Sequence, residues 1–120
     1  MGVRWLVAFR PMEQEFEQVG GVRYGESVWF AVNFTIPFAR LCVKRERIVL
    51  RVSFIGLTRR TFEFLKPEIR ALRWKRGIFS KGLLIEHAKP DYPPFILFWT
   101  SNRKALGSAL SGLGYDLPPV

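Results

Sequence analysis

Residues 28–54 read VWFAVNFTIPFARLCVKRERIVLRVSF, and the spacing of their apolar side chains decides the fold class. From Val28 to Ile36 every second residue is apolar, which is the period of a strand with one buried face. Pro37 cannot donate a ladder hydrogen bond, so it marks a break, a bulge or an edge. The apolar phase then changes, and residues 39–43 predict a second strand or a sharp bend. The stretch therefore predicts antiparallel β-structure.

A charged turn inside this stretch predicts a hairpin. Residues 44–47 are Lys-Arg-Glu-Arg, and apolar alternation resumes over residues 48–54, so the hairpin has a basic tip. Beyond it, a connection and a corner separate several short strands. The connection is residues 55–60, the corner is residues 66–68, and the strands are predicted over residues 61–64, 69–76, 83–87 and 95–99.

Helical spacing occurs only near the two ends of the chain. After Ser101 or Asn102, either of which can cap a helix, apolar side chains form one stripe at helical spacing up to Leu113. Gly114 ends this helix. Near the N-terminus, Pro11 precedes several acids and Gly20-Gly21 follows, which predicts a short helix over residues 11–19.

The length of 120 residues is enough for one domain with its own core. We therefore expect a mainly β (α+β) fold. It is a strongly bent antiparallel sheet or partly open barrel of six to seven strands, closed by one C-terminal helix. The predicted boundaries are an N-terminal extension with a short helix (1–24) and a β-domain (25–117) whose helix spans residues 102–113.

Several classes of site are excluded by composition. Cys42 is the single cysteine and His87 the single histidine, so an internal disulfide and a zinc site with two histidines are impossible. The bases around Cys42 predict a lowered thiol pKa, and the strand phase of His87 predicts a half-buried packing role. No enzyme activity and no cofactor are predicted. We expect a cytoplasmic protein, with peripheral attachment at the inner membrane face as a further option.

Charge is the most informative property of the composition. Nineteen Lys and Arg against ten Asp and Glu give a net charge of +9. Residues 40–81 hold thirteen of the bases and only three of the acids, so the middle third carries the surplus. Such asymmetry indicates an anionic partner, namely nucleic acid, an acidic lipid surface or an acidic protein. The other explanation is a solvated surface that confers solubility.

Tryptophan residues offer two candidate binding positions. Trp74 lies beside Arg73 and Lys75, a cluster suited to stacking on single-stranded nucleic acid, but its alternation with Leu72 favours a core position. Trp29 is the best candidate for an exposed interface residue.

Four features together resemble a known family. Gly25-Glu26 precedes the first predicted strand, residues 45–50 form a polar turn followed by an Arg-apolar-apolar strand start, and residues 64–72 form a corner with spaced apolar residues. The closing helix carries Leu106, Leu110 and Gly114. This pattern is similar to the pleckstrin-homology-like domains, nearest to the bacterial PH and GRAM-type branch.

The resemblance implies a non-catalytic binding scaffold. Some members of the family recognise phosphoinositides through bases on and around the first hairpin, and the matching positions are Lys44, Arg45 and Arg47, with Arg51 and Arg40 nearby. Glu46 interrupts this cluster.

The predicted function is a binding module that presents its basic surface to an acidic protein or to anionic membrane headgroups, with self-association through the strand edge around Pro37 as an option. The alternative is an OB-like barrel that binds single-stranded nucleic acid. The predicted anion-binding residues are Lys44, Arg45, Arg47, Arg51, Arg59, Arg60, Arg73 and Lys75.

Overall fold

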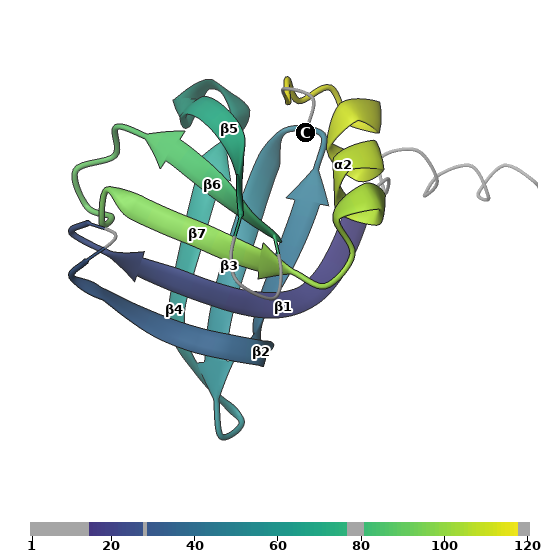
Figure 1. Ribbon diagram of the computed structural model, residues 1–120. Coiled ribbons are helices and arrows are strands. Elements are labelled where there is room, and N and C mark those ends of the chain that lie inside the picture. The colour runs from purple at the N-terminus through teal and green to yellow at the C-terminus, as the bar shows by residue number, and fades with distance from the viewer. Residues whose placement is uncertain (1–14, 28, 77–80, 118–120) are drawn as a thin grey trace, which may run out of the picture.

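The computed structural model describes residues 15–27, 29–76 and 81–117. Seven strands and a C-terminal helix account for most of them (Figure 1). The elements are β1 (Glu15–Gly25), β2 (Ala31–Lys44), β3 (Arg47–Phe54), β4 (Leu57–Leu65), the 3-10 helix η2 (Lys66–Glu68), β5 (Ile69–Arg76), β6 (Lys81–His87), β7 (Phe95–Thr100) and α2 (Arg103–Gly112).

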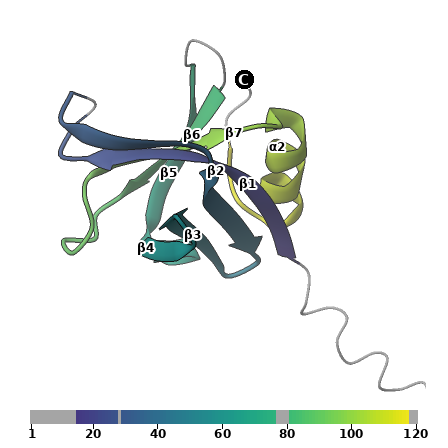
Figure 2. The same ribbon diagram turned by 90° about the horizontal axis from the view of Figure 1, so that it is seen from below.

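All seven strands belong to one antiparallel sheet, in the order β4-β3-β2-β1-β7-β6-β5. The sheet is strongly bent, so that β1 and β7 cross over β3 and β4 (Figures 1 and 2). It does not close, because the edge strands β4 and β5 are not paired with each other. The predicted mainly β class with one C-terminal helix is confirmed.

The core lies between the two halves of the bent sheet and extends under α2. Its fully buried side chains are large and apolar, as in Phe62, Phe64 and Phe98, which suits tightly packed pleated strands. Leu106 and Leu110 of α2 are also fully buried, so the helix stripe joins this core as predicted. Asn102 is the helix N-cap, and its side chain accepts a 3.1 Å hydrogen bond from the Ala105 N–H.

The predicted N-terminal helix is wrong over residues 15–19, because these residues begin β1; residues 11–14 lie outside the described residues. Glycine explains the error. A Cβ on Gly20 would clash with the Trp99 carbonyl oxygen and one on Gly21 with that of Phe34, so these glycines permit close strand approach instead of ending a helix. The predicted domain boundary between residues 24 and 25 falls inside β1.

The first half of β2 does not bury its apolar face as predicted. Val32 and Ile36 share that face and are 50% and 46% exposed. Pro37 marks an irregularity, as predicted. The pairing of β2 with β1 skips from Phe34 to Ala39 opposite Gly20 and Val22, and buried residues follow from Ala39 onward. The phase change therefore reflects a bulge within one long strand.

The β3–β4 hairpin is longer than predicted. Residues 57–60, which were expected in a connection, already belong to β4, and only Ile55 and Gly56 form the turn. The corner at residues 66–68, the strands through Leu72 and Ile85, and the connection before β7 agree with the prediction.

Candidate functional site

The predicted basic hairpin, residues 44–47, joins β2 to β3 and is held by the C-terminal part of the chain. The Tyr115 hydroxyl donates a 2.6 Å hydrogen bond to the Lys44 carbonyl oxygen, and the Lys66 N–H donates one of 2.8 Å to the Glu46 carbonyl oxygen. The Lys66 ammonium in turn donates to the Leu113 carbonyl oxygen at 2.8 Å. The backbone of the hairpin is therefore held by hydrogen bonds from Tyr115, after the C-terminal helix, and from Lys66, after β4.

Acidic residues neutralise much of the charge of this hairpin and of the strands beside it. The ion pairs on this outer face are Glu15–Lys44 (3.7 Å), Glu17–Arg40 (3.1 Å) and Arg47–Glu63 (2.6 Å). The hydrogen bond that Arg47 donates to the Glu63 carboxylate raises the pKa of Arg47, which keeps the guanidinium charged and paired. Lys44 and Arg47 therefore already have anionic partners within the fold.

The strand count explains why the sequence pointed to this hairpin. The sequence predicts a helix where β1 begins, so the turn at residues 44–47 is predicted to be the first hairpin, whereas in the structure it is the second. The first hairpin joins β1 to β2 through residues 26–30, which contain no Lys or Arg. The resemblance implies bases on the first hairpin, whereas Lys44, Arg45 and Arg47 lie on the second.

The other predicted anion-binding residues lie in separate places. Arg51 is exposed on the outer face of β3, whereas the Arg60 guanidinium lies 4.6 Å from the ring centroid of Phe62 and that of Arg59 lies 6.0 Å from Phe54. Arg59 is thus next to the β3–β4 turn, whereas the Arg60 guanidinium lies over the rings of Phe62 and of Tyr24 in β1.

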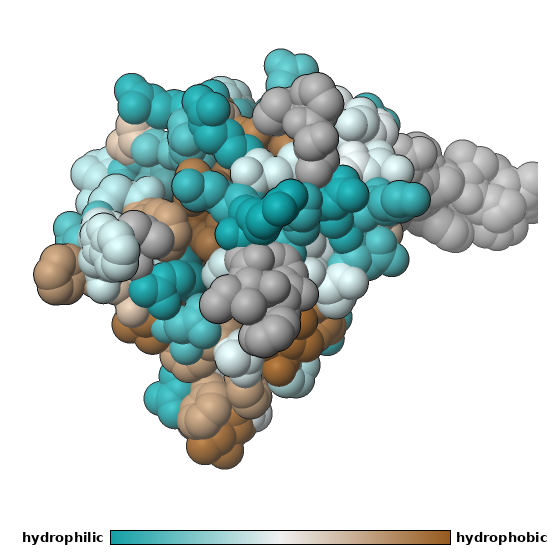
Figure 3. Space-filling model, viewed as in Figure 1, coloured by the Kyte–Doolittle hydropathy of each residue, from teal (hydrophilic) through white to brown (hydrophobic). Residues whose placement is uncertain are grey.

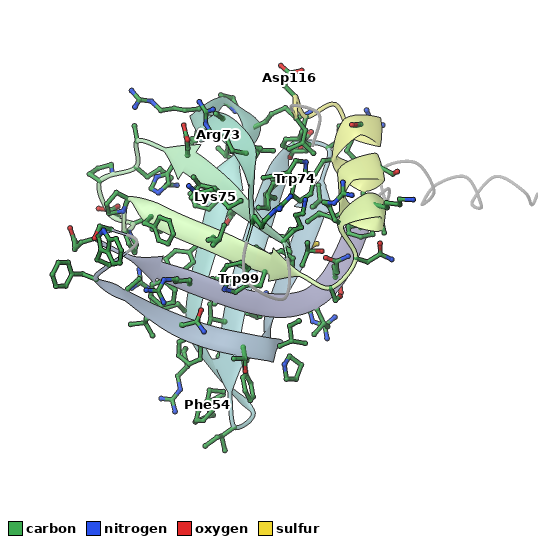
Figure 4. All side chains as sticks on the ribbon, in the orientation of Figure 1. Phe54, Arg73, Trp74, Lys75, Trp99 and Asp116 are labelled. Carbon is green, nitrogen blue, oxygen red and sulfur yellow. The ribbon has the colours of Figure 1, made fainter. Side chains whose placement is uncertain are left out.

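Arg73 and Lys75 are on β5, at the opposite edge of the sheet from β4. Figure 4 shows these two residues in the upper half of the molecule, far from Phe54 at the bottom. Arg73 is bound to Glu86 at 2.6 Å. The eight predicted residues therefore do not form one surface.

The structure shows instead an exposed apolar surface that the sequence did not predict as a whole. Trp29 and Phe30, beside the β1–β2 turn, are 84% and 77% exposed, which confirms the prediction of an exposed Trp29. Ile55 and Leu57, at the β3–β4 turn, are 75% and 62% exposed. We call the following exposed side chains the apolar rim: Trp29, Phe30, Val32, Ile36, Ile55 and Leu57.

Aromatic contacts connect the two parts of the apolar rim. The ring of Phe54, just before the β3–β4 turn, lies 6.2 Å from Phe34 and 5.1 Å from Phe38, both of β2. The β3–β4 hairpin points away from α2 and shows brown, hydrophobic atoms at its tip, while the β1–β2 hairpin lies on the side opposite α2 (Figures 1 and 3). The alternation over residues 28–36 predicts a strand with one buried face, whereas Val32 and Ile36 of that face are exposed.

Cys42 corrects the prediction of a lowered thiol pKa. Burial raises the pKa of its thiol, and Glu15 and Glu17 raise it further, against the smaller opposing effect of Lys44 and Arg51. The thiol therefore does not have the lowered pKa that the neighbouring bases suggested. The ligand atoms of Glu15, Glu17 and Cys42 lie within 4.8 Å of one another, but both carboxylates are already in the cross-strand ion pairs.

His87 has the half-buried packing role that was predicted. Its Nδ1 accepts a 2.9 Å hydrogen bond from the Lys89 N–H, so in the neutral ring Nε2 carries the proton that it donates to the Pro93 carbonyl oxygen at 2.9 Å. The ring also packs against Phe64, 5.0 Å between centroids. Both ring nitrogens thus hold the connection between β6 and β7.

None of the helices formed by the described residues has the length and apolar character needed to span a bilayer.

Comparison of this chain with protein-family models and with curated proteins found no match. The resemblance to pleckstrin-homology-like domains therefore stays a prediction based on the chain's own residues.

Proposed function

We propose that this chain is a non-catalytic, pleckstrin-homology-like docking module whose apolar rim, with the arginines beside it, attaches peripherally to an anionic membrane surface. The observation that carries the proposal is the exposure of large apolar side chains on two hairpin tips that face away from α2. Seven antiparallel strands and a covering C-terminal helix are compatible with the architecture that the family resemblance implies.

The backbone at the β3–β4 turn supports a functional role for the exposed side chains. Ile55 has a φ of 54° and Gly56 a φ of 72°. Two successive residues with positive φ are typical of the tight hairpin turns that favour Asn-Gly. A β-branched residue at such a position costs about 1–3 kcal/mol, and Ile55 recovers little by burial because it is 75% exposed. A strained backbone at an exposed isoleucine is expected where the side chain is kept for binding and not for stability.

Charge favours an anionic surface as the partner. Arg59 lies beside the β3–β4 tip, Arg60 lies over the ring of Tyr24 near the end of β1, and the chain as a whole carries a net charge of +9. Tryptophan and other amphipathic rings concentrate at membrane–water interfaces, which suits Trp29 beside the other tip. Side chains that protrude from separate hairpins fit a deformable lipid interface better than a rigid protein surface, which must offer a pocket for each.

The alternative of an OB-like barrel that binds single strands has less support. OB-folds are five-stranded, whereas this sheet has seven strands. The proposed stacking residue, Trp74, packs against the core. Self-association stays a prediction. Among the described residues, β3 pairs with β2 only over residues 39–43, so the earlier part of β2 has no β3 partner along that edge.

Vesicle co-sedimentation tests the proposal. Trp29→Ala combined with Leu57→Ala removes apolar area from both tips. The loss of each of these two side chains from the membrane is expected to weaken binding to mixed phosphatidylglycerol–phosphatidylcholine vesicles by about tenfold. The matched control is Leu65→Ala, which truncates an exposed leucine (45% exposed) at the other end of β4 and should leave binding unchanged.

Three outcomes would overturn the proposal. They are unaltered vesicle binding by the double variant, equal loss in the Leu65 control, and binding of single-stranded DNA but not of vesicles at low salt. A concentration-dependent dimer that disappears in the double variant, without vesicle binding, would instead assign the apolar rim to self-association.

A further inference from the structure

The two edge strands of the sheet are covered to different extents. At the edge of β4, the Glu63 N–H donates a 3.1 Å hydrogen bond to the Tyr92 hydroxyl, and the Lys89 ammonium donates one of 3.2 Å to the Glu63 carbonyl oxygen. At the edge of β5, no backbone hydrogen bond from residues 70–76 to any element except β6 occurs within the described residues. An uncovered edge strand is a template for another strand.

A groove runs along this uncovered strand. Its volume is about 410 Å³, and it lies between β5 and the residues that follow α2. An adjoining hollow of about 190 Å³ shares four lining residues with it and continues it toward η2. The residues that line the larger groove are Arg70, Ala71, Leu72, Arg73, Asp116 and Leu117.

The groove has a fixed wall. Leu72 is 3% exposed in the core, and a Cβ on Gly107 of α2 would come within 3.5 Å of the Trp74 ring and 3.9 Å of Leu117. Strand β5, helix α2 and the C-terminal segment therefore pack together at this point. Figure 4 shows Trp74 in the middle of the molecule, between Lys75 and α2, with Asp116 near the top.

The charge of β5 restricts what can bind beside it. Its eight residues, IRALRWKR, include four bases and no acid. Of these bases, Arg73 alone has an ion pair among the described residues. Pairing with β5 of a second copy would set these bases opposite one another, and like charges directly across strands are destabilising. An acidic strand would meet complementary charges.

We propose that β5 and its groove bind an extended acidic segment of another protein, which adds to the sheet as a further strand. Main-chain hydrogen bonds to the free edge supply affinity, and alternate side chains supply specificity. Acidic side chains of the segment face Lys75, which has no ion pair among the described residues, because Asp116 on the opposite wall repels them there. This surface is separate from the apolar rim, so it can be occupied while the protein is on a membrane.

Capped ten-residue peptides test the proposal, with NMR chemical shifts of the full chain as the readout. A peptide that alternates Glu with Val should bind and shift residues 70–76 and 114–117. Replacing each Glu by Gln should weaken binding by about tenfold because the cross-strand charge pairs are lost. A central proline should abolish binding because it lacks the N–H donor and does not fit a strand.

Two variants with the same change in net charge complete the experiment. Lys75→Glu reverses a charge on β5 and should weaken binding of the Glu peptide, while Lys104→Glu, exposed on α2, should leave it unchanged. Thermal unfolding of both variants checks that they fold.

The proposal is overturned if the Glu and Gln peptides bind equally, if the shifts lie at the apolar rim, or if both charge variants lose binding equally. It is also overturned if a single-stranded oligonucleotide binds β5 more tightly than the peptide. None of these readouts depends on vesicles, so the result is independent of the membrane proposal.

Discussion

Tyr115 is the residue that fastens the C-terminal segment to the β2–β3 hairpin. Its side chain is 6% exposed, its hydroxyl donates to the Lys44 carbonyl oxygen, and the Lys66 ammonium lies 4.3 Å from its ring centroid. Burial, together with the negative charge of Glu46, raises the pKa of Tyr115 to about 12. The fold therefore holds this phenol in its neutral form.

This shift predicts a loss of stability at high pH. The pKa of Tyr115 is higher in the folded chain than its usual value of 10.0, so the neutral phenol stabilises the fold fully below about pH 10. That contribution, up to about 3 kcal/mol, is lost as the pH rises from 10 through 12. Urea unfolding at pH 9 and at pH 11.5 measures it.

Tyr115→Phe is the matched variant, because it removes only the hydroxyl. It should lower the free energy of unfolding by about 1 kcal/mol at pH 8 through the lost hydrogen bond. It should also remove most of the decrease between pH 10 and 12. An unchanged pH profile in this variant would assign the decrease to other groups.

At the scale of single elements, the β3–β4 hairpin combines an unfavourable turn with exposed apolar side chains. Ile55 lies in the left-handed region although an Asn-Gly turn would satisfy the same geometry without strain. Stability alone does not explain such a residue, since its side chain contributes little to the core.

Ile55→Asn should therefore stabilise the fold and weaken membrane binding at the same time. We expect the free energy of unfolding to rise by about 1 kcal/mol, because Asn tolerates positive φ better than a β-branched residue. Vesicle affinity should fall by about tenfold with the lost apolar side chain. Thermal unfolding and co-sedimentation measure the two effects. A less stable variant, or one that binds as before, contradicts this account of the turn.

At the scale of the whole molecule, opposite regions of the bent sheet have different surroundings. The β2–β3 hairpin is held by Tyr115 and Lys66, and its charges are largely paired. The β1–β2 and β3–β4 tips carry the apolar rim and point away from α2. This arrangement fixes the expected orientation on a membrane.

Hydrogen exchange of backbone amides tests that orientation. Vesicles of phosphatidylglycerol and phosphatidylcholine should slow exchange at residues 29–31 and 54–57, because these amides become shielded from water. Exchange at residues 44–47 should not change. The reverse pattern, with slowing only at residues 44–47, would show that the basic hairpin is the contact after all.

Most of the fold could be predicted from local spacing, namely the period-2 runs over residues 39–54 and 69–76 and the helix stripe after Asn102. In each of these elements the buried apolar side chains recur at the spacing of a strand or of a helix, so the sequence alone shows them. The sequence also indicated an exposed Trp29. Local patterns did not identify β1, since Glu15 and Glu17 look like the first turn of a helix until Lys44 and Arg40 are seen beside them across the strand pair.

Only the tertiary structure decided which residues remain available for binding. A charged side chain looks equally available in the sequence whether or not an acid from a distant strand pairs with it, as Glu63 pairs with Arg47. An apolar face looks equally buried whether or not another layer covers it, and at Val32 and Ile36 none does. Both properties depend on contacts between residues far apart in the chain, so the bent sheet determined the candidate surfaces.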